Sequence, residues 1–174
     1  LLALGQGAVM RRGGFDLAMP SMIAASGMAA VTISQGAWPR FILAFAVILA
    51  AAALLGLWHA FLARRLGRGI VLATLATGGL AQAAATAMFV WAPSGFVPLD
   101  LTALVSRSWL RLPLAVWVLL PIGVIAGLVL DRAWRRGHRG LSAGYVASAL
   151  AAAVFGMLAA AIGGNFRLWL VDTY

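Results

Sequence analysis

The sequence contains no lysine, no glutamate and no cysteine, and each absence removes a class of chemistry. Without lysine the chain cannot form the phosphate-binding loop of nucleotide hydrolases or a Schiff base. Without glutamate it lacks the His-Glu metalloprotease motif, and without cysteine it has no disulfide, thiol nucleophile or thiolate metal site. The two histidines, His59 and His138, do not make a metal site by themselves, so we expect neither a metal nor another cofactor.

Charged residues are also scarce. They make up 10% of the 174 residues, hydrophobic residues make up 64%, and the mean hydropathy is +1.01. A soluble domain has about 25% charged residues, so this composition favours a protein surrounded by membrane lipid. All 13 cations are arginine, all 4 acids are aspartate, and the formal net charge is +9. The arginines lie in short gaps between apolar runs and not on one soluble face, so we expect no nucleic-acid partner.

The apolar runs predict an all-α, polytopic transmembrane helical bundle. A membrane-spanning helix needs about 20 mostly apolar residues. Five runs are long enough for full spans: 17–35, 41–62, 70–91, 112–130 and 141–162. A sixth run, 1–10, is about half as long, so we expect a truncated N-terminal span. We interpret residues 1–174 as one transmembrane permease domain and as a fragment of a longer chain, because the sequence has no initiator methionine and its C-terminus stops abruptly.

The arginines predict which helix ends lie together, because the gaps between successive runs alternate between the two membrane faces. One set of gaps holds nine arginines: Arg11, Arg12, Arg64, Arg65, Arg68, Arg132, Arg135, Arg136 and Arg139. The other set holds four: Arg40, Arg107, Arg111 and Arg167. Cytoplasmic loops carry the excess of positive charge. We therefore predict a multi-pass protein of the bacterial inner (plasma) membrane, with the richer set in the cytoplasm.

The stretch before the first full run combines glycines, charges and a proline. Gly13 and Gly14 precede Asp16, and Arg12 lies four residues before that aspartate, within reach of an ion pair if the turn is helical. A charge beside a membrane span is costly and is usually paired or functional. One interpretation is a tight cytoplasmic turn with Asp16 as a helix cap. The other is a broken helix around Gly13 to Asp16, with free backbone groups that line a cavity.

Several motifs resemble one family of transport proteins. Residues 2–6 (LALGQ) and 13–17 (GGFDL) are similar to the Leu-Gly-Gln helix and the Gly-Gly-Ile-Asp-Leu-Ser-Val-Gly segment of the monosaccharide ABC importer permeases, the ribose and xylose type. Residues 70–77 (IVLATLAT) and 111–116 (RLPLAV) resemble later segments of that family in the same order. The resemblance spans nearly the whole chain, and residues 13–17 are its specific part. Residues 131–140 are shorter than the family's cytoplasmic segment, which includes the helix that docks on the ATPase.

The resemblance implies a transport subunit and not an enzyme. Two permease subunits, identical or different, pair in the membrane, a periplasmic solute-binding protein delivers a simple sugar, and separate ABC ATPase subunits drive transport. Asp16 and Arg12, with Gly13 and Gly14, would hold the broken helix at the translocation path, and Gln6 would line that path. Four arginines would flank the ATPase, although topology charge alone also explains them: Arg132, Arg135, Arg136 and Arg139.

Polar residues inside one apolar run form a regular series. Thr74, Gly78, Gln82 and Thr86 recur every four residues and predict a polar stripe along one helix. The stripe faces either a cavity or a neighbouring helix. For Gln6 the same two alternatives hold, because a polar side chain in a membrane helix also serves as an interhelical hydrogen-bond partner.

Three other functions stay open at this stage. A permease of the same superfamily could carry branched-chain amino acids, a nucleoside or a signalling molecule, because selectivity would lie mostly in the binding protein. Residues 24–27 (AASG) with His59 faintly resemble the serine and histidine of rhomboid intramembrane proteases, in which Ser26 would need His59 within hydrogen-bond reach. However, their positions along the runs place them at different depths, and we expect His59 to be a packing or interfacial residue. A purely structural membrane subunit would leave the break before Asp16 without a reason.

Overall fold

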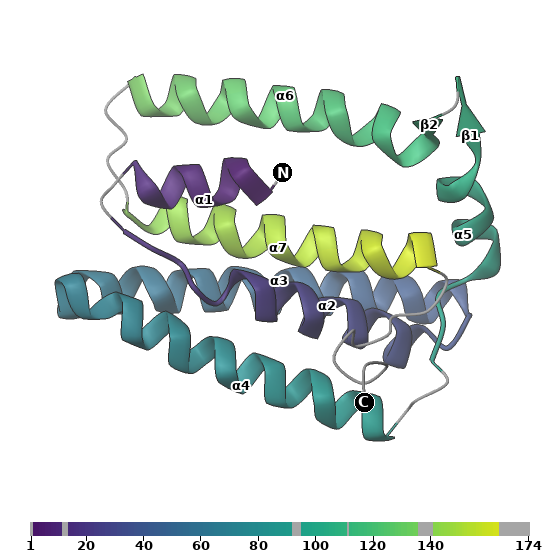
Figure 1. The fold of residues 1–174 in the computed structure, drawn as a ribbon, viewed down its shortest axis with the longest axis horizontal. Coiled ribbons are helices and arrows are strands. Elements are labelled where there is room, and N and C mark those ends of the chain that lie inside the picture. Colours follow the sequence, from purple (N-terminus) through teal and green to yellow (C-terminus); the bar gives the residue numbers. More distant parts are fainter. Residues whose placement is uncertain (1, 12–13, 92–94, 111, 136–140, 164–174) are drawn as a thin grey trace.

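The computed structural model describes residues 2–11, 14–91, 95–110, 112–135 and 141–163, and these form helices and one short hairpin (Figure 1). The elements in chain order are α1 (Leu2–Met10), α2 (Met19–Ser34), α3 (Trp38–Leu66), the 3-10 turn η1 (Gly67–Gly69), α4 (Ile70–Trp91), α5 (Leu99–Ser106), β1 (Ser108–Trp109), β2 (Leu112–Pro113), α6 (Leu114–Arg135) and α7 (Leu141–Gly163). Strands β1 and β2 are antiparallel, with Ser108 opposite Pro113. The predicted all-α class is confirmed.

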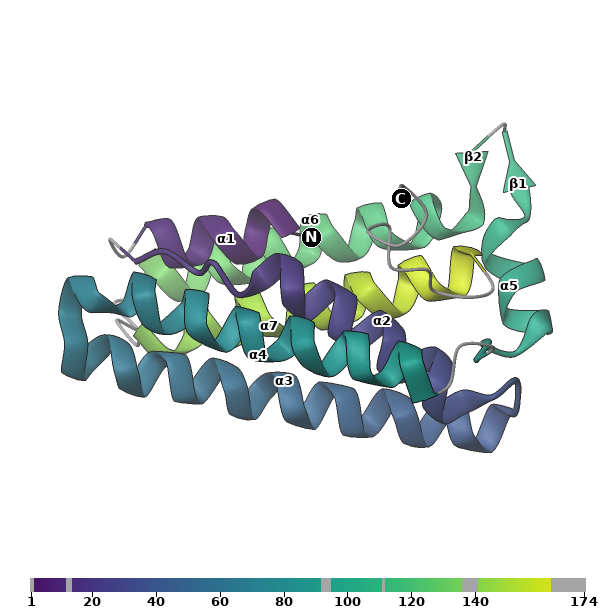
Figure 2. The ribbon, with the colours of Figure 1, turned by 60° about the horizontal axis from the view of Figure 1, so that its bottom comes forward.

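Helix α7 lies in the middle of the bundle. It packs against α1, α2 and α3, and α2 also packs against α3 and α4 (Figures 1 and 2). Helices α3 and α4 form an antiparallel pair joined by η1. Helix α6 lies on the side of α1 and α7 that faces away from α4, and it contacts α1, α5 and β2 (Figure 1).

The interior is built from small side chains, and the large apolar side chains point outward. The residues at the centre of α2, α3 and α7, called here the small-residue core, are Met28, Ala30, Ala44, Ala52, Ala149, Ala153 and Ala160. By contrast, Leu72 is 73% exposed, Leu80 72% and Trp91 85%. Lipid is as apolar as leucine, so membrane helices associate through small residues and leave large apolar residues facing the lipid. This distribution is that of a membrane protein.

Within the described residues, three helices are long and apolar enough to cross a membrane: α3 from Trp38 to Leu66, α4 from Ile70 to Trp91, and α7 from Ala143 to Gly163. The expectation of five full spans is therefore met for three. The run expected at 17–35 forms the 16-residue helix α2, which is about 24 Å long, shorter than the hydrocarbon core of about 30 Å. The run expected at 112–130 begins with strand β2, and its remaining residues, from Leu114, belong to α6.

Local backbone features set the ends of α2. Pro20 lies in its first turn, a position where the missing amide hydrogen costs nothing. At the other end Gln35 and Gly36 take positive φ angles of 42° and 78°, and a side chain at Gly36 would overlap the ring of Phe96. The Phe96 carbonyl accepts hydrogen bonds from the Ser34 hydroxyl and the Gly36 amide, at 2.7 and 2.8 Å. The loop after α4 thus fixes the end of α2.

The arginines of the described residues gather at two ends of the bundle as the sequence predicts. Figure 1 shows the C-terminal ends of α1, α3 and α6 at the same end, together with the N-terminal ends of α4 and α7. This end, called here the arginine-rich end, carries Arg11, Arg64, Arg65, Arg132 and Arg135. Arg40 in the first turn of α3 and Arg107 after α5 lie at the opposite end.

Candidate functional site

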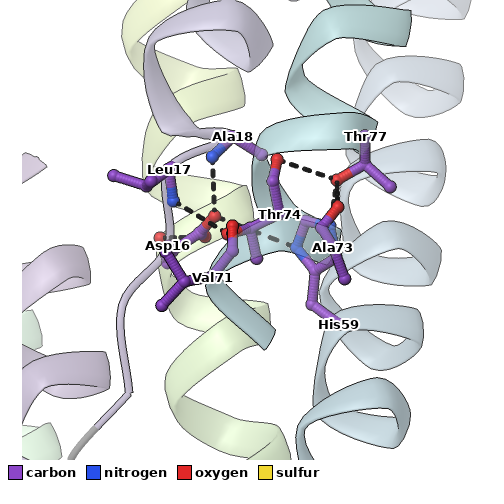
Figure 3. Close-up of polar contacts among 9 residues, drawn as sticks. Asp16, Leu17, Ala18, His59, Val71, Ala73, Thr74 and Thr77 are labelled. Carbon is purple, nitrogen blue, oxygen red and sulfur yellow. Dashed lines mark hydrogen bonds and ion pairs between the residues drawn. The ribbon is translucent and has the colours of Figure 1, made fainter. Parts of the chain in front are cut away.

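Residues 14–17, between α1 and α2, form an extended, non-helical segment (Figure 1), and this segment is fastened at both ends by its backbone amides. The Gly14 amide donates to the Val9 carbonyl at the end of α1, at 3.2 Å, and the Leu17 amide donates to the Thr74 hydroxyl of α4, at 3.3 Å. Of the stretch from Gly13 to Asp16 where the sequence predicts a turn or a broken helix, the described residues 14–16 are non-helical, and the segment is held against α4 (Figure 3).

Asp16 is the buried charge of this segment, with 4% of its surface exposed. Its Oδ2 atom accepts a hydrogen bond from the Ser148 hydroxyl of α7 at 2.8 Å, and its Oδ1 atom accepts one from the Ala18 amide at 3.1 Å. The Nδ1 atom of His59, on α3, lies 3.9 Å from Oδ1. One carboxylate thus links the start of α2 to two other helices.

His59 connects this carboxylate to α4. It is 1% exposed, and its Nε2 atom lies 2.7 Å from the Thr77 hydroxyl oxygen. The Thr77 hydroxyl lies within donor distance of two carbonyls of its own helix, Ala73 at 3.0 Å and Thr74 at 3.1 Å. Figure 3 shows the His59 ring between the Asp16 segment and Thr77. We name the set Asp16, His59, Thr74, Thr77, Tyr145 and Ser148 the polar cluster.

The polar cluster forms one layer below the arginine-rich end. His59 lies seven residues before the last residue of α3, Thr77 seven residues after the first residue of α4, and Ser148 seven residues after the first residue of α7. At about 1.5 Å per residue, each lies about 10 Å inside its helix end. The three helices therefore bring polar side chains to the same depth as Asp16.

Tyr145 closes the cluster from α7. It is 2% exposed, its ring packs edge-on against His59 with a centroid distance of 6.2 Å, and its hydroxyl has no hydrogen-bond partner within the described residues. A side-chain carbon at Gly14 would lie 2.6 Å from that hydroxyl oxygen. A side-chain carbon at Gly56 would lie 2.6 Å from the Cα atom of Val146. Two glycines therefore allow the segment and α3 to approach α7 this closely.

The predicted path residues fall partly inside this region. Asp16 and Gly14 are in it, whereas Arg12 and Gly13 lie outside the described residues, so the expected pairing of Asp16 with Arg12 stays a prediction. Gln6 is on α1, and its Oε1 atom is buried without a hydrogen-bond partner in the described part of the chain. The neighbouring residue Gly5 packs on the Cα atom of Ser148, at 3.0 Å from an added side-chain carbon.

The predicted polar stripe on α4 does not face the same neighbouring helix along its whole length. Thr74 is fully buried, and a side-chain carbon at Gly78 would lie 3.2 Å from the Cα atom of Ala18. Gln82 is half-buried and Thr86 is exposed, its hydroxyl bonded to the Gln82 carbonyl at 3.0 Å. Residues four apart on an α-helix are rotated by about 40°, so a series of four turns through about 120°. The first half of the stripe faces α2, and the second half leaves it.

The predicted ATPase-facing arginines lie apart from the polar cluster. Arg132 is exposed in the last turn of α6, and Arg135 is the last residue of that helix. Arg136 and Arg139 lie outside the described residues. The sequence interpretation did not assign His59, Thr77, Tyr145 or Ser148 to the site. Their signal in the sequence was a polar side chain inside an apolar run, and three of them, His59, Thr77 and Ser148, lie seven residues from a helix end.

The serine protease alternative needs Ser26 beside His59. In the structure the Ser26 hydroxyl donates to the Ile23 carbonyl at 3.0 Å, and the contacts of His59 are with Thr77 and Asp16. Ser26 packs instead against Gly156 of α7. Asp16, His59 and Thr77 follow the order acid, imidazole, hydroxyl, and the Thr77 hydroxyl oxygen also lies 3.0 and 3.1 Å from the Ala73 and Thr74 carbonyls of its own helix.

The described residues contain no group of three or more histidine, cysteine, aspartate or glutamate side chains that could hold a metal ion. In this arrangement one buried carboxylate, that of Asp16, holds the non-helical segment before α2 in place. Comparisons of the chain with protein-family models, curated proteins and solved structures gave no match.

Proposed function

We propose that this chain is the permease subunit of an ABC importer in a bacterial inner membrane and forms the translocation path for a simple sugar. The observation that carries the proposal is the extended connection between α1 and α2, with the GGFDL motif and the buried Asp16 within it. Non-helical backbone at membrane depth is tolerated where it is buried in protein or lines a water-filled cavity. A bundle that only packs needs no buried carboxylate, so we assign the connection to the transport path.

The distribution of arginines supports the orientation of this permease. The arginine-rich end would face the cytoplasm and the ATPase subunits, with Arg132 and Arg135 of α6 beside the contact. The opposite end, with α5 and the hairpin, would face the periplasmic solute-binding protein. Helices α2 and α6 would cross the membrane with α3, α4 and α7, and a second permease subunit would complete the path.

The cargo is the least constrained part of the proposal. A permease of the same superfamily for branched-chain amino acids, a nucleoside or a signalling molecule fits the same geometry. An intramembrane serine protease fits it less well, because Ser26 and His59 have different hydrogen-bond partners. Replacement of Ser26 by alanine would abolish proteolysis if that alternative were correct, and would leave uptake unchanged if the chain is a permease.

Uptake by cells that carry the full-length protein with its binding protein and ATPase tests the proposal. We expect Asp16→Ala to lose uptake of labelled ribose or xylose while the protein remains in the membrane fraction on a blot. The matched control is Asp100→Ala, which removes an exposed aspartate from the first turn of α5 and should keep uptake. Normal uptake by Asp16→Ala would contradict the proposal, and uptake of labelled leucine or a nucleoside in place of sugar would change the cargo.

A further inference from the structure

The hydrogen-bond network around His59 determines where one of its protons lies. A threonine hydroxyl has a single hydrogen to donate. The hydrogen of Thr77 is directed at the carbonyls of Ala73 and Thr74, both within 3.1 Å, as in other threonines of α-helices. At the 2.7 Å contact, therefore, His59 Nε2 donates and the Thr77 oxygen accepts. The imidazole carries a hydrogen on Nε2.

This assignment leaves the other ring nitrogen facing a carboxylate. The Nδ1 atom of His59 has no hydrogen-bond partner within the described residues, and it lies 3.9 Å from Asp16 Oδ1. If the imidazole were neutral and Asp16 ionised, a nitrogen lone pair would face a charged oxygen, and both groups are at least 96% buried. The Ser148 hydroxyl and the Ala18 amide stabilise the carboxylate, but neither lies between it and the nitrogen lone pair. Two electron-rich groups that face each other in the apolar interior repel, and a proton on either atom removes the conflict.

We infer that Asp16 and His59 together form a proton-binding site that fastens the extended segment 14–17 to α3. One proton, taken from water, lies on Nδ1 or on the carboxyl group, so the pair has no net charge in the apolar interior. Release of the proton leaves a carboxylate facing a lone pair, and the repulsion moves the segment away from α3. This inference stands apart from the proposed transport function, because it needs neither cargo nor ATPase.

The surroundings of the pair contain few groups that could titrate in its place. Helix α7 contributes Tyr145 and the non-titrating Ser148, and α4 contributes Thr74 and Thr77, which do not titrate. The start of α2 contributes the Ala18 amide. On α1, Arg11 is exposed at the end of the helix. A Tyr145→Phe variant therefore separates the titration of the pair from that of its titratable neighbour.

Nitrogen-15 NMR of the histidine ring tests the proton count directly. The chain has two histidines, so His138→Gln leaves His59 as the single labelled ring in the full-length protein in lipid nanodiscs. We expect a protonated Nε2, together with an Nδ1 that is protonated or hydrogen-bonded at neutral pH. In Asp16→Ala the Nδ1 signal should become that of a bare nitrogen. A protonated Nδ1 with a bare Nε2, or a bare Nδ1 beside intact Asp16, would overturn the inference.

A spin label on the segment tests the mechanical consequence. The chain has no cysteine, so Leu17→Cys places a single label on an exposed side chain next to Asp16, and Leu80→Cys on the exposed face of α4 is the matched control. From about pH 5 to pH 9 we expect the Leu17 label to become more mobile and the Leu80 label to stay unchanged. Asp16→Asn, which is always neutral, should remove the pH dependence. A Leu17 label with the same mobility at every pH, or with an unchanged response in Asp16→Asn, would contradict the inference.

Discussion

The polar cluster and the small-residue core share helices α3 and α7, yet different forces hold them. In the core, α2, α3 and α7 meet mainly through alanine, and the fit depends on how closely backbones approach. In the polar cluster α3, α4 and α7 meet the segment before α2 around one carboxylate, and the fit depends on hydrogen bonds from Ser148 and Ala18. Membrane helices gain little from contact between large apolar side chains. Their association therefore depends on close approach of the backbones and on hydrogen bonding between helices.

The comparison predicts that the two regions of the bundle are sensitive to different kinds of substitution. Changes of side-chain size should damage the small-residue core, whereas changes of charge or hydrogen bonding should damage the polar cluster. Both regions are tightly packed, so the difference between them lies in charge and hydrogen bonding and not in packing density.

The largest effect is expected from Gly156→Leu in the core. A side-chain carbon there would overlap the Ser26 hydroxyl and the Ile23 carbonyl, so α2 and α7 must separate. We expect a loss of about 3 kcal/mol or more in the free energy of unfolding. Thermal unfolding in detergent, followed by tryptophan fluorescence, measures it. Gly79→Leu on α4, where an added side-chain carbon meets nothing within 4 Å, is the control, and equal losses in both variants would contradict the packing argument.

The next effect is expected from Asp16→Ala in the polar cluster. The substitution leaves the Ser148 hydroxyl and the Ala18 amide without their acceptor, and we expect a loss of about 2 kcal/mol in the free energy of unfolding. Asp16→Asn retains one acceptor oxygen and should lose less than half as much. The same unfolding assay compares the two variants. Equal losses would mean that the site needs both oxygens of the carboxylate, and that one acceptor oxygen on a side chain of the same shape is not enough.

A smaller effect is expected from Gly14→Ala, at a point where the polar cluster leaves no room for an added side chain. Gly14→Ala places a side-chain carbon 2.6 Å from the Tyr145 hydroxyl oxygen, and we expect it to cost about 1 to 2 kcal/mol in the free energy of unfolding. Combination with Tyr145→Phe removes the oxygen and should recover most of the loss. A double-mutant cycle of unfolding free energies checks the pair. Additive losses would show that the two residues do not meet.

The smallest effect is expected from Tyr145→Phe alone. Its hydroxyl is buried and has no hydrogen-bond partner within the described residues, so its removal should change the unfolding free energy by less than about 0.5 kcal/mol. Thermal unfolding beside Tyr174→Phe, at the C-terminal residue, provides the comparison. A loss of 2 kcal/mol or more, on the order of a broken buried hydrogen bond, would show that the hydroxyl has a partner after all.

Some of this architecture could be predicted from the sequence, because hydropathy and glycine carry local information. The run at 70–91 coincides with α4 from Ile70 to Trp91, and the glycines before Asp16 correctly indicated an interruption. The lengths of the spans were predicted less well. The run at 17–35 includes extended residues and yields a helix that starts at Met19, since apolar composition does not distinguish extended backbone from helix.

The partners of Asp16 could not be predicted from the sequence. Ser148 is 132 positions away and His59 is on a different helix, and their meeting depends on how the helices pack. Hydropathy predicts that helices form but not which of them are neighbours, because packing in lipid depends on small surface details. The expected pairing with Arg12 rests on closeness in sequence, the one kind of proximity that a sequence shows directly, and it stays a prediction because Arg12 lies outside the described residues.

The most direct test of the proposed function is co-purification of the full-length protein from native membranes in mild detergent, with mass spectrometry of the proteins that accompany it. We expect a sugar-type ABC ATPase among them, since the arginine-rich end would contact it. The same purification with Asp16→Asn should retain the ATPase, because the polar cluster lies about 10 Å inside the helix ends. If no ATPase accompanies the protein under conditions that keep other ABC complexes intact, the importer proposal is wrong.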